Sequence, residues 1–148
     1  MFSELERDYI QSQGLARIAT VSSDGQPDAA AVAFDFDGEC FYVGGQRNIV
    51  TLKYKNVVNG NLQVGLVIDD RNPDNGLPRG IKLHGRAEIV QRAGYAGDGA
   101  YLKITPTVHW HWGLVEPVIV DDQIVVRKRC GRGTVAKSQD LSCYTPIS

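Results

Sequence analysis

Apolar and polar positions alternate along much of this chain, as they do in antiparallel strands. Alternation over residues 15–21 predicts a strand, and the Ser, Asp, Gly and Pro of residues 22–27 supply a turn before the apolar run 29–34. Residues 35–38 are a second turn signal, and residues 39–43 read as a third strand. We expect these three strands to form a meander.

The second half of the chain continues this pattern. Residues 62–68 and 81–90 predict two strands, the second alternating apolar residues with Lys, His, Arg and Glu. Between them, residues 69–78 are rich in Asp, Asn, Pro and Gly and predict a loop that serves as a lid or rim. Residues 108–112 and 118–126 read as the closing strands.

Two segments have helical rather than alternating periodicity. Ser3 and Glu6 have the spacing of a capping box, and the apolar stripe that follows ends at Gly14. Apolar residues in 48–58 fall on one helical face, and residues 59–61 close that segment. We therefore expect a short N-terminal helix and a second helix packed on the sheet.

Length and charge limit the classes of function. The 148 residues, 43% of them apolar, suffice for one compact domain, which we place at residues 1–126, with a C-terminal tail at 127–148 for which a mobile arm is one interpretation. Sixteen Lys and Arg balance seventeen Asp and Glu, which argues against a broad basic surface for nucleic acid or membranes. Without a bilayer-length apolar run or a leader pattern, we expect a soluble cytoplasmic protein.

The cysteines and histidines do not form a recognisable metal or disulfide motif. Cys40, Cys130 and Cys143 are odd in number, and we expect Cys40 to be a buried strand residue. His109 and His111 would share one face of a strand and could supply two zinc ligands. Only His84 remains as a third imidazole.

A local anion site is predicted after the third strand. If a helix begins near Asn48, its first amides are unpaired donors that favour a phosphate. Thr51 would add a hydroxyl, Lys53 and Lys55 would add charge, and Arg47 could close over the anion with two parallel hydrogen bonds. The alternative interpretation is a solvated basic edge of a surface helix.

Several of these segments, in this order, resemble the split β-barrel family of pyridoxamine phosphate oxidases and flavin reductases. The segments that carry the resemblance are residues 15–34, 41–45, 51–57 and 79–88. Residues 15–21, residues 24–27 and the late Trp112-Gly113-Leu114 are similar to the branch that uses the deazaflavin coenzyme F420. The resemblance covers about residues 3 to 116.

The resemblance implies a mainly β fold, a split β-barrel of six to eight antiparallel strands with a few short helices, and a homodimer with sites at its interface. It places the cofactor ring along two strands and the phosphate on the segment after them. It also places the strand with His109 and His111 near a cofactor pocket or dimer seam without a metal, so we expect no metal site. The implied cofactor-binding residues are Ala29, Ala30, Ala31, Val32, Gly44, Gly45, Arg47, Thr51, Lys53, Lys55, Arg79 and Trp112. Leu52 stands where the oxidases often have Arg, which leaves more room for F420 than for flavin mononucleotide (FMN).

From this resemblance we expect an oxidoreductase that transfers a hydride between F420 and a small conjugated organic acceptor. The cofactor would carry the difficult step, so no catalytic triad is needed and no catalytic residue is assigned. One alternative is an FMN-dependent pyridoxamine phosphate oxidase-like enzyme or flavin reductase. Another is a non-catalytic cofactor-binding or redox-sensing protein.

Overall fold

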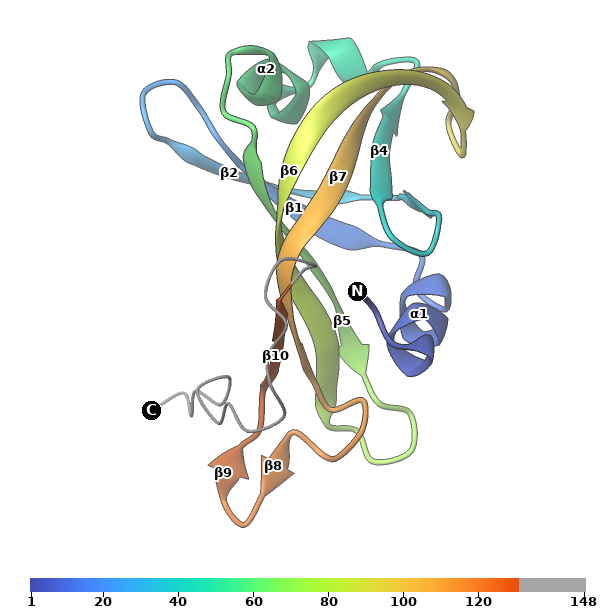
Figure 1. Cartoon of the computed structure of the whole chain (residues 1–148), viewed down its shortest axis with the longest axis vertical. Coiled ribbons are helices and arrows are strands. Elements are labelled where there is room, and N and C mark those ends of the chain that lie inside the picture. The colour runs from blue at the N-terminus through green and yellow to red at the C-terminus, as the bar shows by residue number, and fades with distance from the viewer. Residues whose placement is uncertain (131–148) are drawn as a thin grey trace.

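The computed structural model describes residues 1–130 of the chain. Within these residues the chain forms two helices, one 3-10 turn and ten strands (Figure 1). The elements are α1 (Glu4–Gln11), β1 (Ala16–Val21), β2 (Pro27–Val32), β3 (Asp35–Phe36), β4 (Phe41–Gly45), η1 (Asn48–Val50), α2 (Leu52–Val58), β5 (Gln63–Arg71), β6 (Pro78–Gly94), β7 (Gly97–Trp112), β8 (Ile119–Val120), β9 (Gln123–Ile124) and β10 (Arg127–Cys130).

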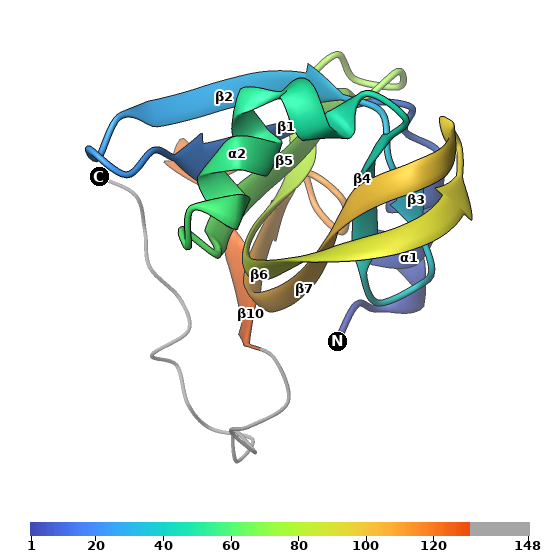
Figure 2. The ribbon, with the colours of Figure 1, turned by 90° about the horizontal axis from the view of Figure 1, so that it is seen from above.

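An eight-stranded antiparallel sheet dominates the fold, in the order β2-β1-β5-β6-β7-β4-β3, with β10 also paired to β7. Seen from above, the strands wind around a common interior, and α2 lies across the near end (Figure 2). This confirms the expected antiparallel barrel with short helices. Neither helix of residues 1–130 is long and apolar enough to cross a membrane.

The strand order corrects the expected meander. β1 and β2 form the predicted hairpin, but β4 pairs with β7 and β1 pairs with β5. After β3 the chain makes a tight turn in which the Asp37 carboxylate accepts the amides of Glu39 and Cys40 at 2.9 and 2.7 Å. This turn joins β3 to β4, so the third expected strand belongs to a separate hairpin.

The longest elements are β6, with 17 residues, and β7, with 16. The strands predicted at 81–90 and 108–112 are only parts of them. Residues 97–107 escaped prediction because Asp98, Gly99 and Pro106 are weak strand formers, and pairing with β6 overrides that preference. The β6–β7 hairpin therefore runs the full height of the barrel (Figure 1).

The loop expected at residues 69–78 is shorter than predicted. β5 continues to Arg71, β6 starts at Pro78, and Asp70 stands opposite Arg79 in the register. An ion pair of 2.7 Å joins these two side chains. Polar residues can occupy strands where a cross-strand partner compensates their charge, so the prediction was wrong at both ends of the loop.

The C-terminal part of the described chain also differs from expectation. Instead of one strand over 118–126, β8 and β9 form a small hairpin whose turn residues Asp121 and Asp122 have φ of 50° and 61°. Residues 127–130, assigned above to the tail, form β10 against β7. Residues 131–148, with Cys143, lie outside the described residues.

Helix α1 forms as the sequence indicates. Ser3 and Glu6 make both capping-box hydrogen bonds, at 2.7 and 3.3 Å, and the helix buries Ile10 and Tyr9 against the sheet.

Cys40 was expected to be buried but lies just before β4 and is partly exposed. The fully buried core comprises Ile10, Ile18, Phe41, Leu66, Leu83, Leu102 and Ile104, among others.

Candidate functional site

A cavity of about 440 Å³ lies among β2, β4, the η1–α2 segment and the tip of the β6–β7 hairpin. This volume suits a small-molecule ligand. Seven of the predicted binding residues line it, namely Ala31, Val32, Gly44, Gly45, Arg47, Thr51 and Lys53. Five further lining residues were absent from the list of predicted binding residues, namely Ala33, Gln46, Asn48, Tyr95 and Ala96. We refer to this cavity as the β2–β4 pocket.

Small residues shape one side of the pocket. Gly44 and Gly45 have φ of 149° and 130°, values that residues other than glycine rarely adopt. A Cβ at Gly45 would lie 2.5 Å from that of Ala96, and a Cβ at Gly44 would lie 2.6 Å from the carbonyl oxygen of Ala100. The two glycines therefore let the hairpin tip pack directly on β4 and leave backbone open to the pocket.

Thr51 marks the start of α2 and corrects the expected helix start near Asn48. Residues 48–50 make a single 3-10 turn, Thr51 is extended, and the seven-residue helix starts at Leu52. The Thr51 hydroxyl donates to the Asn48 carbonyl at 2.7 Å and accepts the Tyr54 amide at 3.4 Å. Thr51 is thus a helix cap as well as a pocket residue.

Buried polar contacts hold this segment in place. Asn48 is 3% exposed, and its side-chain amide donates to the Ala100 carbonyl of β7 at 3.0 Å. Asn56 of α2 donates to the Thr20 hydroxyl of β1 at 2.9 Å. Such buried hydrogen bonds are costly to break, so the pocket wall between them is well anchored.

Two cations, Arg47 and Lys53, face the pocket from this wall. Neither takes part in an ion pair within residues 1–130. Burial lowers the pKa of Lys53, and the negative charge of Asp28 partly opposes this. A partly desolvated cation without an ion-pair partner is a favourable contact for an anionic ligand group.

Five predicted residues do not line the pocket. Ala29 and Ala30 precede its lining residues on β2, and Lys55 is exposed one helical turn into α2. Trp112 ends β7, where its indole covers Gly80 so closely that a Cβ there would lie 2.5 Å from the ring. Arg79 lies near the start of β6, at the opposite end of that strand from the pocket.

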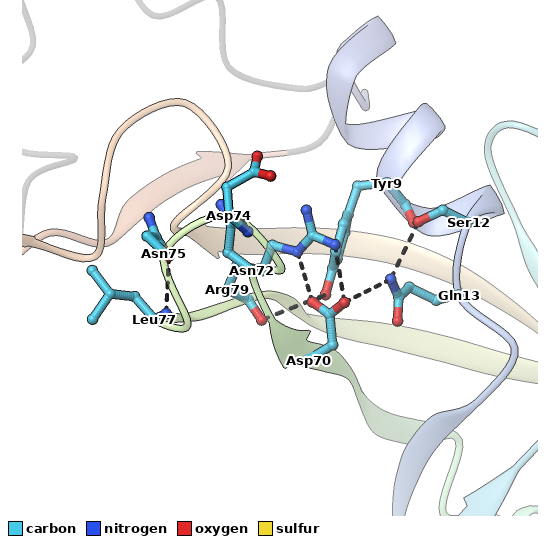
Figure 3. A network of polar contacts seen from close by, with 9 residues as sticks. All are labelled: Tyr9, Ser12, Gln13, Asp70, Asn72, Asp74, Asn75, Leu77 and Arg79. Carbon is cyan, nitrogen blue, oxygen red and sulfur yellow. Dashed lines mark hydrogen bonds and ion pairs between the residues drawn. The ribbon is translucent and has the colours of Figure 1, made fainter.

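Arg79 belongs to a polar network that joins α1 to the sheet (Figure 3). Its Nε and Nη2 donate to the two carboxylate oxygens of Asp70 at 2.7 and 3.0 Å. The Tyr9 hydroxyl donates to Asp70 at 3.0 Å, and the guanidinium carbon lies 5.1 Å from the centre of the Tyr9 ring. The hydrogen bond from Arg79 lowers the pKa of Asp70. The guanidinium is thus already engaged in a forked pair.

The two histidines considered as zinc ligands are buried beneath α1. Nε2 of His109 lies 2.9 Å from Oε1 of Glu6, and Nε2 of His111 lies 3.7 Å from the same oxygen. Throughout residues 1–130, no three His, Cys, Asp or Glu side chains are grouped to hold a metal ion. These imidazoles contribute to the packing of α1.

Among the pocket residues that the sequence analysis missed, Tyr95 carries a hydroxyl group that can bind a ligand. Its hydroxyl accepts the Gly44 amide at 3.1 Å. The glycines at 94 and 97 signal a hairpin turn around it, but nothing local indicates that this turn returns to β4. A tight turn that carries an aromatic hydroxyl between two glycines was the available signal.

Comparisons with known proteins agree with this architecture. The 5a,11a-dehydrotetracycline/5a,11a-dehydrooxytetracycline reductase of Streptomyces rimosus is 32% identical over 98 residues, which are 63% of this chain and 67% of the relative. A solved F420 reductase has a TM-score of 0.54 and 21% identity over 69% of this chain and 94% of its own. A conserved hypothetical protein of Mycobacterium tuberculosis has a TM-score of 0.51 and 27% identity over 62% of this chain and 56% of its own.

The family itself is established by a match along most of the chain. The sequence profile described as pyridoxamine 5'-phosphate oxidase matches residues 2–126. That span includes the whole β2–β4 pocket and every strand of the barrel except β10. The chain therefore belongs to the pyridoxamine 5'-phosphate oxidase family of split β-barrel proteins.

Proposed function

We propose that this protein is an oxidoreductase that binds coenzyme F420 in the β2–β4 pocket and uses it to reduce a small conjugated organic acceptor. Membership of the family and the name of the Streptomyces relative both support an oxidoreductase. The shared fold with an F420 reductase is compatible with this cofactor. Leu52 at the oxidases' customary Arg position adds to the preference for F420 over FMN.

The observation that carries the proposal is the pairing of two chemically different surfaces in one pocket. Arg47 and Lys53 supply positive charge without ion-pair partners in the described chain. Beside them, Ala31, Val32 and the Gly44-Gly45 backbone supply an uncharged surface of mostly small residues. A cofactor with a flat ring and a phosphate matches both surfaces.

The residues present therefore fit F420. Bound there, the coenzyme would supply a hydride to the acceptor. Arg47 and Lys53 would bind its phosphate, and the small residues of β2 and β4 would let the ring approach the backbone. The protein's part in the reaction is then to orient the two reactants and to exclude water.

We also propose a homodimer. Ile49, Val50, Leu52 and Val58 are 50–66% exposed on the η1–α2 segment that forms one wall of the pocket. Four large apolar side chains so close together form a surface that a second copy could cover. Sedimentation of the wild type and of Val50→Asp tests this: a wild-type dimer and a weakened variant are expected, and a wild-type monomer would refute it.

Titration of the purified protein with F420 and with FMN tests the proposed function. We expect saturable binding of F420 in the micromolar range or tighter, then oxidation of bound reduced F420 when a conjugated alkene or quinone is added. Preferential binding of FMN would favour the flavin alternative, and saturable F420 binding without turnover of any acceptor would favour a binding protein. Absence of saturable binding of either cofactor would refute the proposal.

A further inference from the structure

The tip of the β6–β7 hairpin is held rigidly over the β2–β4 pocket. The Tyr95 amide donates to Oδ2 of Asp35 at 3.1 Å, and the Ala96 amide donates to the Tyr101 hydroxyl at 3.1 Å. That hydroxyl in turn donates to the Gly97 carbonyl at 2.8 Å. Each residue of the turn is thus fixed by a hydrogen bond, so the position of the Tyr95 side chain is well determined.

The side chain of Tyr95 is oriented by two further contacts. Its ring packs edge-on against Tyr101, with centroids 5.8 Å apart, and its hydroxyl oxygen accepts the Gly44 amide at 3.1 Å. This amide belongs to a glycine with φ of 149°, at which a Cβ would collide with Ala100 and Asn48. Glycine is therefore required at the position whose amide donates to the Tyr95 hydroxyl.

With its oxygen acting as an acceptor, the Tyr95 hydroxyl still has a hydrogen to donate. No residue of the described chain accepts that hydrogen, and Tyr95 lines the pocket with 43% of its surface exposed. Burial raises the pKa of Tyr95, so the phenol stays protonated at neutral pH. It is an oriented, neutral donor carried by the β6–β7 turn, whereas Arg47 and Lys53 come from the η1–α2 segment and the residue before it.

The geometry points to Tyr95 as a cofactor-binding residue that donates a hydrogen bond to an uncharged acceptor oxygen of the bound redox cofactor. This inference rests on the proposed function and adds a residue to its site. The cations suit the phosphate, whereas a neutral phenol beside Gly44 and the alanines suits a carbonyl or hydroxyl oxygen of the ring or its linker. Asp35, which holds the Tyr95 amide, is then a positioning residue.

Tyr95→Phe and Tyr42→Phe form a matched pair for the test. Each removes one hydroxyl, but that of Tyr42 donates to Asp37 at 2.8 Å and does not line the pocket. Dissociation constants for F420 and FMN are measured by titration, together with the melting temperature of each variant. We expect Tyr95→Phe to raise the dissociation constant of the preferred cofactor about three- to ten-fold, and Tyr42→Phe to change it less than two-fold.

The outcomes separate this inference from the function on which it rests. An unchanged dissociation constant in Tyr95→Phe overturns the role of Tyr95, even if the melting temperature falls because the Gly44 amide has lost its partner. If Lys53→Ala weakens binding while Tyr95→Phe does not, the pocket stands and only the Tyr95 inference fails. A wild type that binds neither cofactor refutes the proposed function and the Tyr95 role with it.

A second measurement uses the wild type alone. Tetranitromethane nitrates exposed tyrosine rings, and peptide mass spectrometry identifies which tyrosines are nitrated. Saturating cofactor is expected to reduce nitration of Tyr95 at least several-fold. Nitration of Tyr95 at the same rate with and without saturating cofactor would contradict the contact.

Discussion

Glu6 of α1 and His109 of β7 form a buried pair, with Oε1 of Glu6 2.9 Å from Nε2 of His109 and side chains that are 1% and 0% exposed. His111 and Arg129 lie 3.7 and 3.9 Å from the same oxygen. Burial opposes ionisation, but hydrogen bonds from His109 and the Ser3 amide prevail and lower the pKa of Glu6 to about 2. Three side chains from β7 and β10 therefore converge on one carboxylate oxygen of α1.

Replacing Glu6 by Gln should destabilise the protein by about 1–3 kcal/mol, because the buried Nε2 of His109 loses the charged partner of its hydrogen bond and Arg129 loses a nearby counter-charge. Urea denaturation followed by tryptophan fluorescence measures the change. Glu4→Gln is the matched control, since Glu4 lies in the same first turn but is exposed. Equal stability of the Glu6 and Glu4 variants would show that the buried pair contributes little.

The same carboxylate predicts a loss of stability in acid. The ordinary pKa of Glu6 is 4.5 and its folded value is about 2, so the unfolded chain binds the proton first. Stability is therefore present above about pH 4.5 and falls by roughly 3 kcal/mol as the pH drops towards 2. His111, whose pKa is lowered by burial, acts in the same direction below its ordinary value of 6.5. Unfolding free energies measured between pH 7 and 3 should fall less steeply in Glu6→Gln than in the wild type.

Lys53→Ala should weaken cofactor affinity by about 1.5 to 3 kcal/mol, because it removes a charged hydrogen bond to the phosphate. Titration with F420 or FMN measures the loss. Lys55→Ala provides the comparison, since Lys55 is exposed two residues further on and does not line the pocket. Equal losses in both variants would mean that general positive charge, rather than the pocket, attracts the ligand.

Arg79→Ala should lower stability by about 1–2 kcal/mol and leave cofactor affinity within two-fold of the wild type. The reason is its forked pair with Asp70, whose side chain is 31% exposed, at the far end of β6 from the pocket. Thermal denaturation and a binding titration on the same sample separate the two effects. A large loss of affinity with unchanged stability would return Arg79 to the binding site.

Gly45→Ala should cost more stability than Gly38→Ala, although both glycines have positive φ. At Gly38 nothing lies within 4 Å of a new Cβ, so only backbone strain of about 1–2 kcal/mol is added. At Gly45 the Cβ also collides with Ala96 at 2.5 Å and must displace the hairpin tip. Cofactor affinity should fall in the Gly45 variant alone, and equal stability losses would count against this packing.

Local signals predicted the parts of this fold that depend on neighbouring residues. The capping box of Ser3 and Glu6 and the β1–β2 hairpin both form as expected. The pairing of β4 with β7 did not follow from the sequence, because the partners are about 60 residues apart and no local preference specifies which strands meet. The extent of β7 was missed for the related reason that its early residues favour turns.

The candidate site divides in the same way. Arg47, Thr51 and Lys53 lie close together in the sequence, so their proximity in the pocket could be predicted. Tyr95 reaches the pocket only because the long hairpin returns to β4, which a reading of separate segments does not reveal. Arg79 was drawn into the predicted site by its charge, while the partner that occupies its guanidinium lies nine residues earlier on another strand.

Because the β6–β7 hairpin is long, its two ends serve separate purposes: one end holds α1 and the other lines the pocket. One end of the ribbon is locked beneath α1 by buried polar contacts, while the two-residue turn at its far end lines the β2–β4 pocket. Substitutions at residues 95 and 96 can thus alter which molecules are accommodated without disturbing the fastening of the N-terminal helix. A designer seeking new ligand preference in this scaffold should begin by randomising those two positions.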